Sequence, residues 1–362
     1  MRYKWGDLIS LEYGKPVKDK AALDGPVPVF GTNGRIGTSH LPPLCPNASF
    51  ILGRKGAYRG VHYSSIPFSV IDTAFYARNL VPDKLSLKWA YYMFLTYDIN
   101  NMDSGSAIPS TDRYEIYAIE VELPTLEEQL KAVHLLETLD DKIELNQKIN
   151  ENLYEIVNAY YTQLFGNVVN RMVTVGAYTD RIYSGGTPTT SNPAYWDGVY
   201  NWFSSGETRN RFVISTEKTI TQSGIDNSST KLAKKYDIVI ASAGQGFTRG
   251  QASMLLLDTY INQSVIVIHA NKVALPYLFW NLANRYEELR AISDSSSIRG
   301  SLTTKMISAL GIPQVTNDAL QTFSEFAWSI IPQIERNLFE NQRLETLRDT
   351  LLPKLMCGEI EI

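Results

Sequence analysis

Cations, an aromatic residue and glycines occur together in one short stretch of this sequence, GRKGAYRG at residues 53–60. Arg54, Lys55 and Arg59 could contact phosphates and base edges, and Tyr58 could pack on a base. The three glycines would let the backbone approach another polymer closely. The stretch therefore predicts contacts to nucleic acid, although each arginine alone also fits a solvated surface position.

A second stretch of this kind, GQGFTRG at residues 244–250, follows the apolar run DIVIASA. We expect a buried strand followed by a glycine-rich loop that directs Arg249 outward. The loop is not GxGxxG, and no acidic residue follows at the spacing that dinucleotide binding needs. The alternative is a plain tight turn. Arg209 and Arg211 in ETRNRF, and Arg299 in SSSIRGS, are further cationic candidates on predicted loops.

The sequence contains no recognisable set of catalytic residues. The segment NPAY at residues 192–195 resembles the NPxY loop of adenine methyltransferases, which holds the target amine and stacks on the base. Those enzymes also need a strand and a glycine-rich turn for the methyl donor, and none lies upstream at useful spacing. No Ser/His/Asp, Cys/His or paired-carboxylate set and no Walker loop can be assembled. We expect no catalytic residues.

Cysteine, histidine and apolar content limit the remaining functions. Cys45 and Cys357 lie far apart and are expected to be free thiols in a reducing compartment. The four histidines show no ligand spacing, so neither a metal nor a cofactor is predicted. No run of 18 apolar residues exists, and the start, MRYKWGDLIS, lacks the apolar core of a signal peptide. A cytoplasmic protein without a membrane segment is the expectation.

The net charge of −4 is unevenly distributed along the chain. Residues 123–168 carry 3 basic and 8 acidic side chains, whereas residues 169–313 carry 14 and 10. Phosphate binding depends on the local patch and not on the total charge. The charge pattern is therefore compatible with nucleic-acid contacts outside the acidic segments, or with helices that are simply rich in glutamate.

Two segments rich in turn signals must position the candidate loops. Residues 1–122 alternate short apolar runs with glycine and proline, which predicts a mainly β domain with one helix near residues 85–97. Residues 169–313 repeat this character, with buried strands at YDIVIASA and SVIVIHA and a helix at residues 275–290. Their order matches: KWAYYMFLTY parallels PYLFWNLANRY, and GRKGAYRG occurs where ASAGQGFTRG occurs.

Two long amphipathic segments separate and follow these domains. Residues 140–165 repeat at residues 331–356 without a gap, so that Ile143 falls on Ile334 and Leu164 on Leu355. Thr125 and Glu128 form a capping-box pattern, which predicts an earlier helix start. Because Pro332 aligns with Asp141, we expect a pause near residues 138–140 and separate long helices that start near 140 and 331. A helix of about 25 residues is about 37 Å long.

Paired asparagines interrupt the apolar seam of these helices. Asn146 and Asn150 in the first copy match Asn337 and Asn341 in the second. A buried asparagine in a coiled coil costs stability but fixes register. We expect the four to hold the helices in antiparallel register, the alternative being that they face solvent or a partner.

At this point the chain resembles the specificity subunits of type I restriction–modification enzymes. The resemblance rests on LPTLEEQ (123–129), LDDKIELNQKINENLYEIVNAYYTQLF (139–165), LRDTLLPKLMCGEI (347–360) and SGGTPTTSNPAYWDGVYNW (184–202), with YDIVIASAGQGF further on. It explains NPAY as part of a recognition-domain motif. The second copy departs in QVTNDAL, which lacks the EEQ of the first, and in Arg348, where the first has Val157.

The resemblance implies an α+β fold. Two mainly β target recognition domains, each with a helix, would be separated by two long antiparallel helices that form a coiled-coil spacer, in a pseudo-two-fold internal repeat. The expected boundaries are 1–122 and 169–313 for the recognition domains, and 123–168 and 314–362 for the helical regions, with long helices at about 140–166 and 332–356.

The implied function is sequence-specific binding of double-stranded DNA in a bipartite target. The subunit would be non-catalytic, with partners that are modification subunits, two in number, and restriction/translocase subunits. A bivalent protein-interaction scaffold and a stand-alone adenine methyltransferase are the alternatives. The expected DNA contacts are Arg35, Arg54, Lys55, Tyr58, Arg59, Thr187, Arg209, Arg211, Gln245, Arg249 and Arg299.

Overall fold

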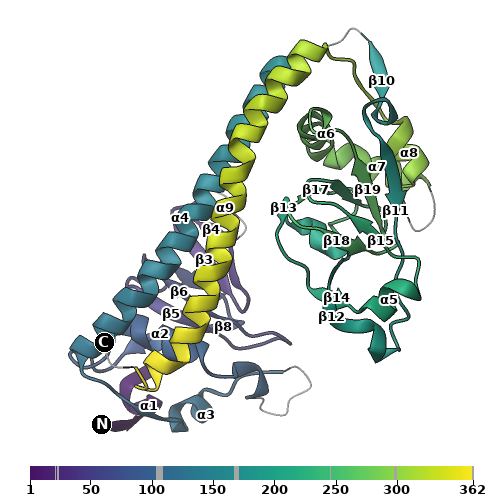
Figure 1. Ribbon diagram of the computed structural model, residues 1–362. Helices are drawn as coiled ribbons and strands as arrows, with labels where there is room; N and C mark the ends of the chain where they lie inside the picture. Colours follow the sequence, from purple (N-terminus) through teal and green to yellow (C-terminus); the bar gives the residue numbers. More distant parts are fainter. Residues whose placement is uncertain are drawn as a thin grey trace. The chain divides into compact units, whose positions relative to one another are not determined.

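The computed structural model describes residues 1–20, 22, 24–102, 109–166, 171–244, 246–296 and 300–360. They form two compact units (Figure 1). Unit 1 consists of Met1–Ile143 and Arg343–Ile362, and unit 2 is the intervening Glu144–Gln342. Each unit therefore combines one β-rich segment with parts of both long helices.

Unit 1 is built on two sheets and a core helix. The larger sheet has the order β2-β8-β5-β6 and is antiparallel, and the smaller has the order β4-β3-β7. The strands are β1 (Arg2–Lys4), β2 (Ile9–Tyr13), β3 (Val27–Gly31), β4 (Gly34–Ser39), β5 (Ser49–Gly53), β6 (Val61–Ser64), β7 (Ser69–Val70), β8 (Ala74–Asn79) and β9 (Glu120–Glu122). The short helices are α1 (Trp5–Leu8), α2 (Leu87–Leu95), η1 (Ile99–Asn101) and α3 (Arg113–Ala118).

The core of unit 1 lies between the larger sheet and α2. Trp5, Phe50, Trp89 and Phe94 are fully buried there, and β5 is buried along its whole length. Ser86 caps α2 by accepting a hydrogen bond from the Trp89 backbone N–H at 3.3 Å. The helix predicted at residues 85–97 is thus confirmed, and its aromatic residues serve the core.

Unit 2 repeats this plan with additional elements. Its larger sheet has the order β11-β19-β16-β17-β13 and its smaller one β14-β12-β18-β15. The strands are β10 (Met172–Thr174), β11 (Arg181–Ser184), β12 (Trp196–Phe203), β13 (Phe212–Val213), β14 (Lys218–Ile220), β15 (Lys231–Ala233), β16 (Ile238–Ala241), β17 (Ala252–Leu255), β18 (Thr259–Ile261), β19 (Val265–His269) and β20 (Gly311–Pro313). The helices are η2 (Val175–Tyr178), η3 (Pro193–Tyr195), η4 (Ser205–Arg209), α5 (Gln222–Asp226), α6 (Ala274–Ala283), α7 (Tyr286–Ser296) and α8 (Thr304–Ala309).

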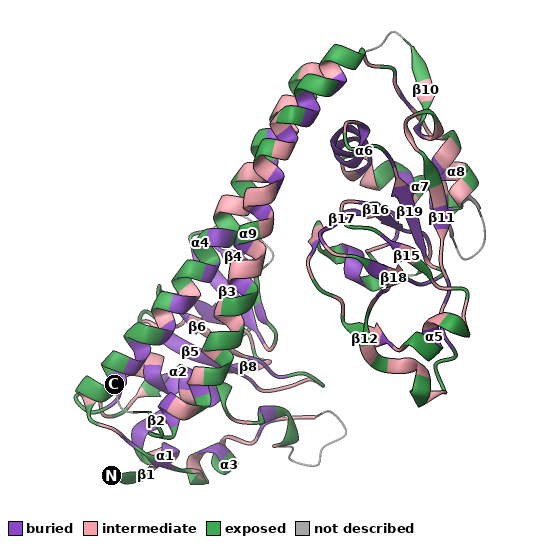
Figure 2. Ribbon diagram, in the orientation of Figure 1, coloured by how far each residue is buried: buried purple, intermediate pink, exposed green. Residues whose placement is uncertain are grey.

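The predicted strands of unit 2 are confirmed, and its predicted helix is divided. YDIVIASA contains β16 and SVIVIHA contains β19, and both strands lie in the buried centre of the sheet (Figure 2). The helix expected at residues 275–290 is two helices, because α6 ends at Ala283 and α7 begins at Tyr286. The break lets α6, which is buried from Ala274 to Leu282, be followed by the more exposed α7.

The two long helices are continuous, which corrects the expected pause. α4 runs from Leu126 to Phe165 and α9 from Asn317 to Met356, so both ends keep the 191-residue offset. Each has 40 residues and is about 60 Å long, longer than the 37 Å expected. The capping box is confirmed, since the Thr125 backbone N–H donates to Glu128 at 2.8 Å and the Glu128 N–H to the Thr125 hydroxyl at 3.3 Å.

Pro332 lies inside α9 and does not start it, so the inference from its alignment with Asp141 is wrong. A proline there removes one N–H donor from the helix ladder. Ile331 and Ile334, on either side of it, are 0% and 1% exposed. Burial of this apolar face in the core of unit 2 stabilises a continuous helix. This stabilisation outweighs the tendency of proline to end the helix.

Candidate nucleic-acid interface

The two glycine-rich stretches occupy equivalent places in the two units. We call residues 54–60 loop A, which joins β5 to β6, and residues 242–251 loop B, which joins β16 to β17. Since β5 and β16 have matching neighbours in their sheets, both loops leave the same edge of the same strand arrangement. The parallel inferred from sequence order therefore reflects the fold.

Backbone hydrogen bonds hold the first residue of each loop in the same way. In loop A, the Arg54 N–H donates to the Thr73 carbonyl and the Arg54 carbonyl accepts from the Thr111 N–H, both at 2.9 Å. In loop B, the Ser242 N–H donates to the Ser264 carbonyl and its carbonyl accepts from the Leu302 N–H, both at 2.8 Å. Arg54 and Ser242 are thus structurally equivalent.

The equivalence extends to the first glycine after this anchor. Gly56 has φ +124° and Gly244 has φ +125°, a conformation that L side chains rarely adopt. Lys55 and Ala243, the residues before them, form isolated bridges with Ser110 and Ser301. Both loops therefore turn at the same point, because each has a glycine with a positive φ there.

Arg54 belongs to an aromatic and guanidinium cluster in unit 1. Its guanidinium carbon lies 4.8 Å from the centre of the Tyr13 ring, and that of Arg113 lies 4.9 Å from the same ring. Arg113 also lies 5.1 Å from the Tyr114 ring. Such stacking holds the cations in fixed positions at a partly exposed surface. The sequence did not reveal this cluster, because Tyr13 and the adjacent Arg113 and Tyr114 are far from Arg54 along the chain.

Arg59 and Arg249 are buried, which corrects their expected outward placement. Arg59 is 2% exposed, and its Nη2 donates to the Asn100 carbonyl at 2.6 Å. Arg249 is 5% exposed, forms an ion pair with Asp294 and donates from Nη1 to the Gly300 carbonyl at 3.3 Å. Buried guanidinium groups need partners in the protein. Arg249 has a carboxylate and a carbonyl, whereas Arg59 has the Asn100 carbonyl, and its Nε and Nη1 make no hydrogen bond to the described residues. Neither side chain is available to DNA in this conformation.

The other unit 1 candidates are accessible. Tyr58 is 64% exposed at the tip of loop A, and Arg35 on β4 is exposed as well. Lys55 and Arg54 are half-buried. Arg54 donates from Nη1 to the Asp72 carbonyl at 2.8 Å, which leaves part of its guanidinium facing outward.

The unit 2 candidates have protein partners of their own. The Thr187 hydroxyl hydrogen-bonds to Gln263, and exposed Arg209 forms an ion pair with Glu217. Arg211 pairs with Glu151 of α4 at 3.2 Å and lies 3.6 Å from the Tyr154 ring centre. Arg211 thus joins the domain to its helix. Gln245 and Arg299 lie outside the described residues.

The four asparagines of the helix seam contact one another in unit 2. Asn146 donates from Nδ2 to Asn341 Oδ1 at 2.9 Å and to Glu340 at 2.7 Å. Asn337 donates to Asn150 Oδ1 at 2.7 Å. Asn146 is 1% exposed, and Asn337 and Asn341 are 5% exposed. As the residue number rises along α4, that of its partner falls along α9, so the helices are antiparallel (Figure 1).

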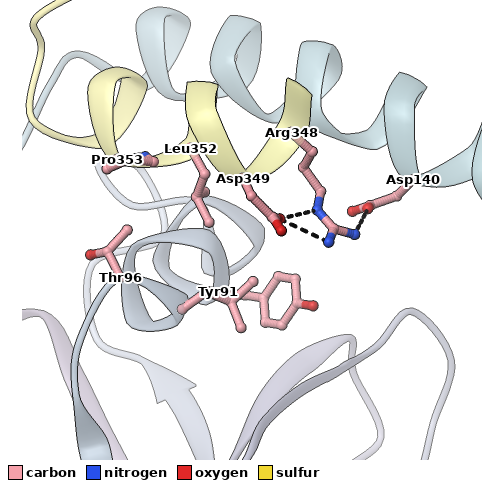
Figure 3. Close-up of a pocket in the computed structure, with 8 residues that line it drawn as sticks. Tyr91, Thr96, Asp140, Arg348, Asp349, Leu352 and Pro353 are labelled. Carbon is pink, nitrogen blue, oxygen red and sulfur yellow. Dashed lines mark hydrogen bonds and ion pairs between the residues drawn. The ribbon is translucent and has the colours of Figure 1, made fainter. Parts of the chain in front are cut away.

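An ionic cluster joins the same two helices in unit 1. Arg348 donates to Asp140 and Asp349, both at 2.9 Å (Figure 3). The Tyr92 hydroxyl donates to Asp140 at 2.7 Å. Burial alone would lower the pKa of Arg348, but these hydrogen bonds raise it above its ordinary value. Burial and the bond to Asp140 raise the pKa of Tyr92 well above its usual range. The cluster borders a pocket of about 550 Å³.

Metal and membrane features were searched within the described residues. No cluster of three or more His, Cys, Asp or Glu suited to a metal ion occurs there. No helix among them is long and apolar enough to cross a membrane. Both cysteines are free, Cys45 buried and Cys357 exposed.

Comparisons with known proteins agree with this architecture. The model of the type I restriction modification DNA specificity domain matches residues 6–155 and 181–345. The chain is 23% identical over 353 residues to the type I restriction enzyme EcoR124I/EcoR124II specificity subunit of Escherichia coli, covering 87% of each chain. It is 24% identical over 184 residues to the HindI specificity subunit of Haemophilus influenzae, covering 50% of this chain and 39% of that subunit.

A solved structure has the same fold. The crystal structure of the type I restriction-modification system S subunit from M. genitalium superposes with a TM-score of 0.66 at 17% identity, covering 98% of this chain and 96% of that one. Two repeated β-rich units on paired long helices define a class of DNA specificity proteins. The chain belongs to the type I restriction modification DNA specificity family, as a specificity subunit.

Proposed function

We propose that this chain binds a bipartite DNA sequence, with unit 1 reading one half-site and unit 2 the other. The observation that carries the proposal is the repetition of one strand order in two units whose equivalent loops differ in chemistry. Loop A begins Arg54-Lys55 and loop B begins Ser242-Ala243. Two equal scaffolds with unequal side chains suit the recognition of two different sequences.

The accessible candidates would divide between backbone and base contacts. Arg35, Arg54 and Lys55 supply cations for phosphates or guanine edges, and Arg113 supports Arg54 through Tyr13. In unit 2, Thr187 and Arg209 are the accessible polar candidates, and Gln245 and Arg299, which lie outside the described residues, stay candidates from the sequence alone. Arg211 contributes indirectly, because its contacts to Glu151 and Tyr154 fix the domain against α4.

The long helices would set the spacer between half-sites. Their asparagine pairs and the Asp140–Arg348 ion pair fix one antiparallel register. The test inserts one helical turn of about four residues after Ile149 and another after Asn337, so that the asparagine pairs on both sides of the insertion are kept. The expected result is a spacer longer by on the order of one to two base pairs, at 1.5 Å per residue, with both half-sites unchanged. An unchanged spacer in methylome sequencing would sink the spacer proposal.

The chain would serve as the non-catalytic partner of modification and restriction subunits. Ile156 on α4 and Leu347 on α9 are equivalent in the helix repeat and are 52% and 46% exposed. Exposed apolar residues at equivalent places suit the docking of two copies of one partner, here two modification subunits. Ile156→Asp and Leu347→Asp should each remove one copy, measured by mass photometry of the assembled complex. Retention of both copies in the double variant would contradict this arrangement.

Sequence-specific binding itself is tested with the assembled complex. Methylome sequencing of cells that express the chain with modification subunits should reveal one bipartite motif. Random methylation, or none, would argue against DNA specificity in this chain. The scaffold and methyltransferase alternatives gain no support from the comparisons.

A further inference from the structure

Loops A and B share a pattern that their sequences only partly reveal. Each exposes one aromatic side chain and buries the arginine that follows it within two residues. Tyr58 is 64% exposed and Arg59 is 2% exposed. Phe247 is 88% exposed and Arg249 is 5% exposed. Loop B is longer than loop A by three residues, so the pattern is not a consequence of equal loop length.

The buried arginines connect each loop to the segment that follows the core helices. Arg59 donates from its backbone N–H to Asn100 Oδ1 at 2.7 Å and from Nη2 to the Asn100 carbonyl at 2.6 Å. Asn100 lies in η1, which follows α2. Arg249 pairs with Asp294 in α7, which follows α6. In both units, an inward arginine holds the loop against the same part of the fold.

Loop B has further bracing directly beneath its aromatic tip. The Tyr286 hydroxyl donates to the Phe247 carbonyl, and Arg290 Nη1 donates to the Gly246 carbonyl, both at 2.6 Å. Gly250, with φ +90°, closes the loop by donating to the Ala241 carbonyl at 2.9 Å. These bonds fix the backbone that carries Phe247, whose side chain is exposed.

Exposure of an apolar ring to water is unfavourable in the free protein, and its burial by a partner in a complex is favourable. The transfer of a side chain of this size from water into an apolar contact is favourable. Because the loop is already held, little further ordering is needed when a partner covers the ring. DNA bases offer apolar partners, through their ring faces and the methyl group of thymine.

We propose that Tyr58 and Phe247 are equivalent base-contacting tips, one for each half-site, and that Arg59 and Arg249 are positioning residues for them. This proposal rests on the proposed function. It assigns the aromatic residues, and not the arginines beside them, to the bases. Tyr58 can add a hydrogen bond through its hydroxyl, whereas Phe247 offers only apolar contact, so the two half-sites are read by different chemistry.

The experiment measures DNA affinity of the complex with its modification subunits on duplexes that carry the mapped motif. Tyr58→Ala should lower affinity about tenfold and relax base preference in one half-site only, since the variant loses the contact between the ring and a base. Phe247→Ala should do the same in the other half-site. Replacing thymine by uracil removes the methyl group and tests for a methyl contact. Replacing an adenine of the half-site by 2-aminopurine reports unstacking of that base. A response to either replacement supports the proposal.

Matched controls use exposed apolar residues elsewhere in the same units. Ile66→Ala in unit 1 and Met172→Ala in unit 2, with side chains 53% and 60% exposed, should leave both half-sites unchanged. If Tyr58→Ala and Phe247→Ala keep wild-type preference at every position, the proposal is overturned. If the wild-type complex shows no bipartite preference at all, the proposed function fails first, and the two failures are therefore distinguishable.

The positioning role has a separate test. Tyr286→Phe removes the hydroxyl beneath Phe247 at an exposed site, so melting temperature should stay unchanged while affinity falls about threefold through the unit 2 half-site alone. Arg249→Lys should recover part of the preference that Arg249→Met loses. Equal loss in both half-sites, or loss that follows melting temperature, would reduce these residues to a general structural role.

Discussion

Units 1 and 2 have matching backbones at their reading loops and different side chains on them. Arg54 and Ser242 make the same two backbone hydrogen bonds, yet one carries a guanidinium stacked on Tyr13 and the other a short hydroxyl. The scaffold therefore depends on main-chain groups and on glycines at Gly56 and Gly244. Side chains between these fixed points can change without altering how the loop leaves the sheet.

The units differ again where the long helices pack. In unit 1, the contact includes the Asp140–Arg348–Asp349 cluster. In unit 2, the equivalent positions hold the fully buried apolar residues Ile331 and Val157. Farther along the helices the contact is aromatic, because Phe323 lies 5.6 Å from the ring centre of Tyr161 and 5.4 Å from that of Phe165. An ionic contact and an aromatic one thus perform the same joining role, with different sensitivity to salt and to truncation.

The largest expected effect comes from truncating the aromatic contact. Phe323→Ala should destabilise unit 2 by about 3–5 kcal/mol, because a fully buried ring is replaced by a cavity. Denaturant unfolding followed by tryptophan fluorescence measures the loss, and half-buried Phe326→Ala is the milder control. A loss below that of the control would show that the packing relaxes.

The cationic start of loop A gives the next effect. Arg54→Ala with Lys55→Ala should weaken DNA binding more than tenfold and flatten the salt dependence of log K, because phosphate contacts release counterions. Titration at several salt concentrations measures both. Arg78→Ala, at another exposed arginine of unit 1, is the control for the loss of one positive charge, to be compared with Arg54→Ala alone. Ser242→Ala in loop B should change neither the DNA affinity nor its salt dependence. A large loss of affinity in this variant would contradict the proposed difference between the two loops.

Removal of the ionic contact should have a smaller effect on stability. Arg348→Met is expected to cost about 1 kcal/mol, since Arg348 and Asp140 are partly exposed and solvent screens the pair. The difference from wild type should shrink in high salt, as followed by thermal melting. A salt-independent difference would point to lost packing and not to lost charge.

The asparagine pairs invite a change in the opposite direction. Asn146→Leu with Asn341→Leu should raise the melting temperature by a few degrees while weakening control of register. The pair matters: Asn146 contacts Asn341, and Asn150 contacts Asn337. A clear drop in melting temperature would show that these amides stabilise the seam outright.

The smallest effect concerns pH and unit 1 alone. Burial lowers the pKa of His62, which contacts the Thr32 carbonyl beneath loop A. A folded-state pKa below 6.5 means that the unfolded chain binds the proton more readily, so stability falls as pH drops below about 6.5. In unit 2, the residue at the position of His62 is Ser253, because each is the second residue of the strand that follows its loop. Serine does not titrate in this pH range, so the effect is expected in unit 1 alone. His62→Gln should flatten the melting temperature between pH 7.5 and 5; an equal slope in the variant would assign the effect elsewhere.

Periodicity and repeats made much of this fold predictable. The 191-residue repeat located both helices and their partnership, and apolar runs located β16 and β19. Propensity misled at Pro332, where packing of Ile331 and Ile334 outweighed a local breaker. The sites were harder: a sequence cannot tell whether Arg59 faces Asn100 or solvent, nor that Tyr13, Arg54 and Arg113 meet. Such contacts depend on long-range backbone geometry.

The chain order of the two units affects how they are completed during synthesis. Unit 2 is one continuous segment, whereas Leu352, Leu355 and Met356 of α9 complete a core with Ala132 and Val133. A nascent chain therefore contains all of unit 2 before unit 1 can close. The apolar face near Ala132 stays uncovered until residues 343–356 leave the ribosome. Exposed apolar surface favours aggregation, so we expect the nascent chain to be most prone to aggregate during this interval.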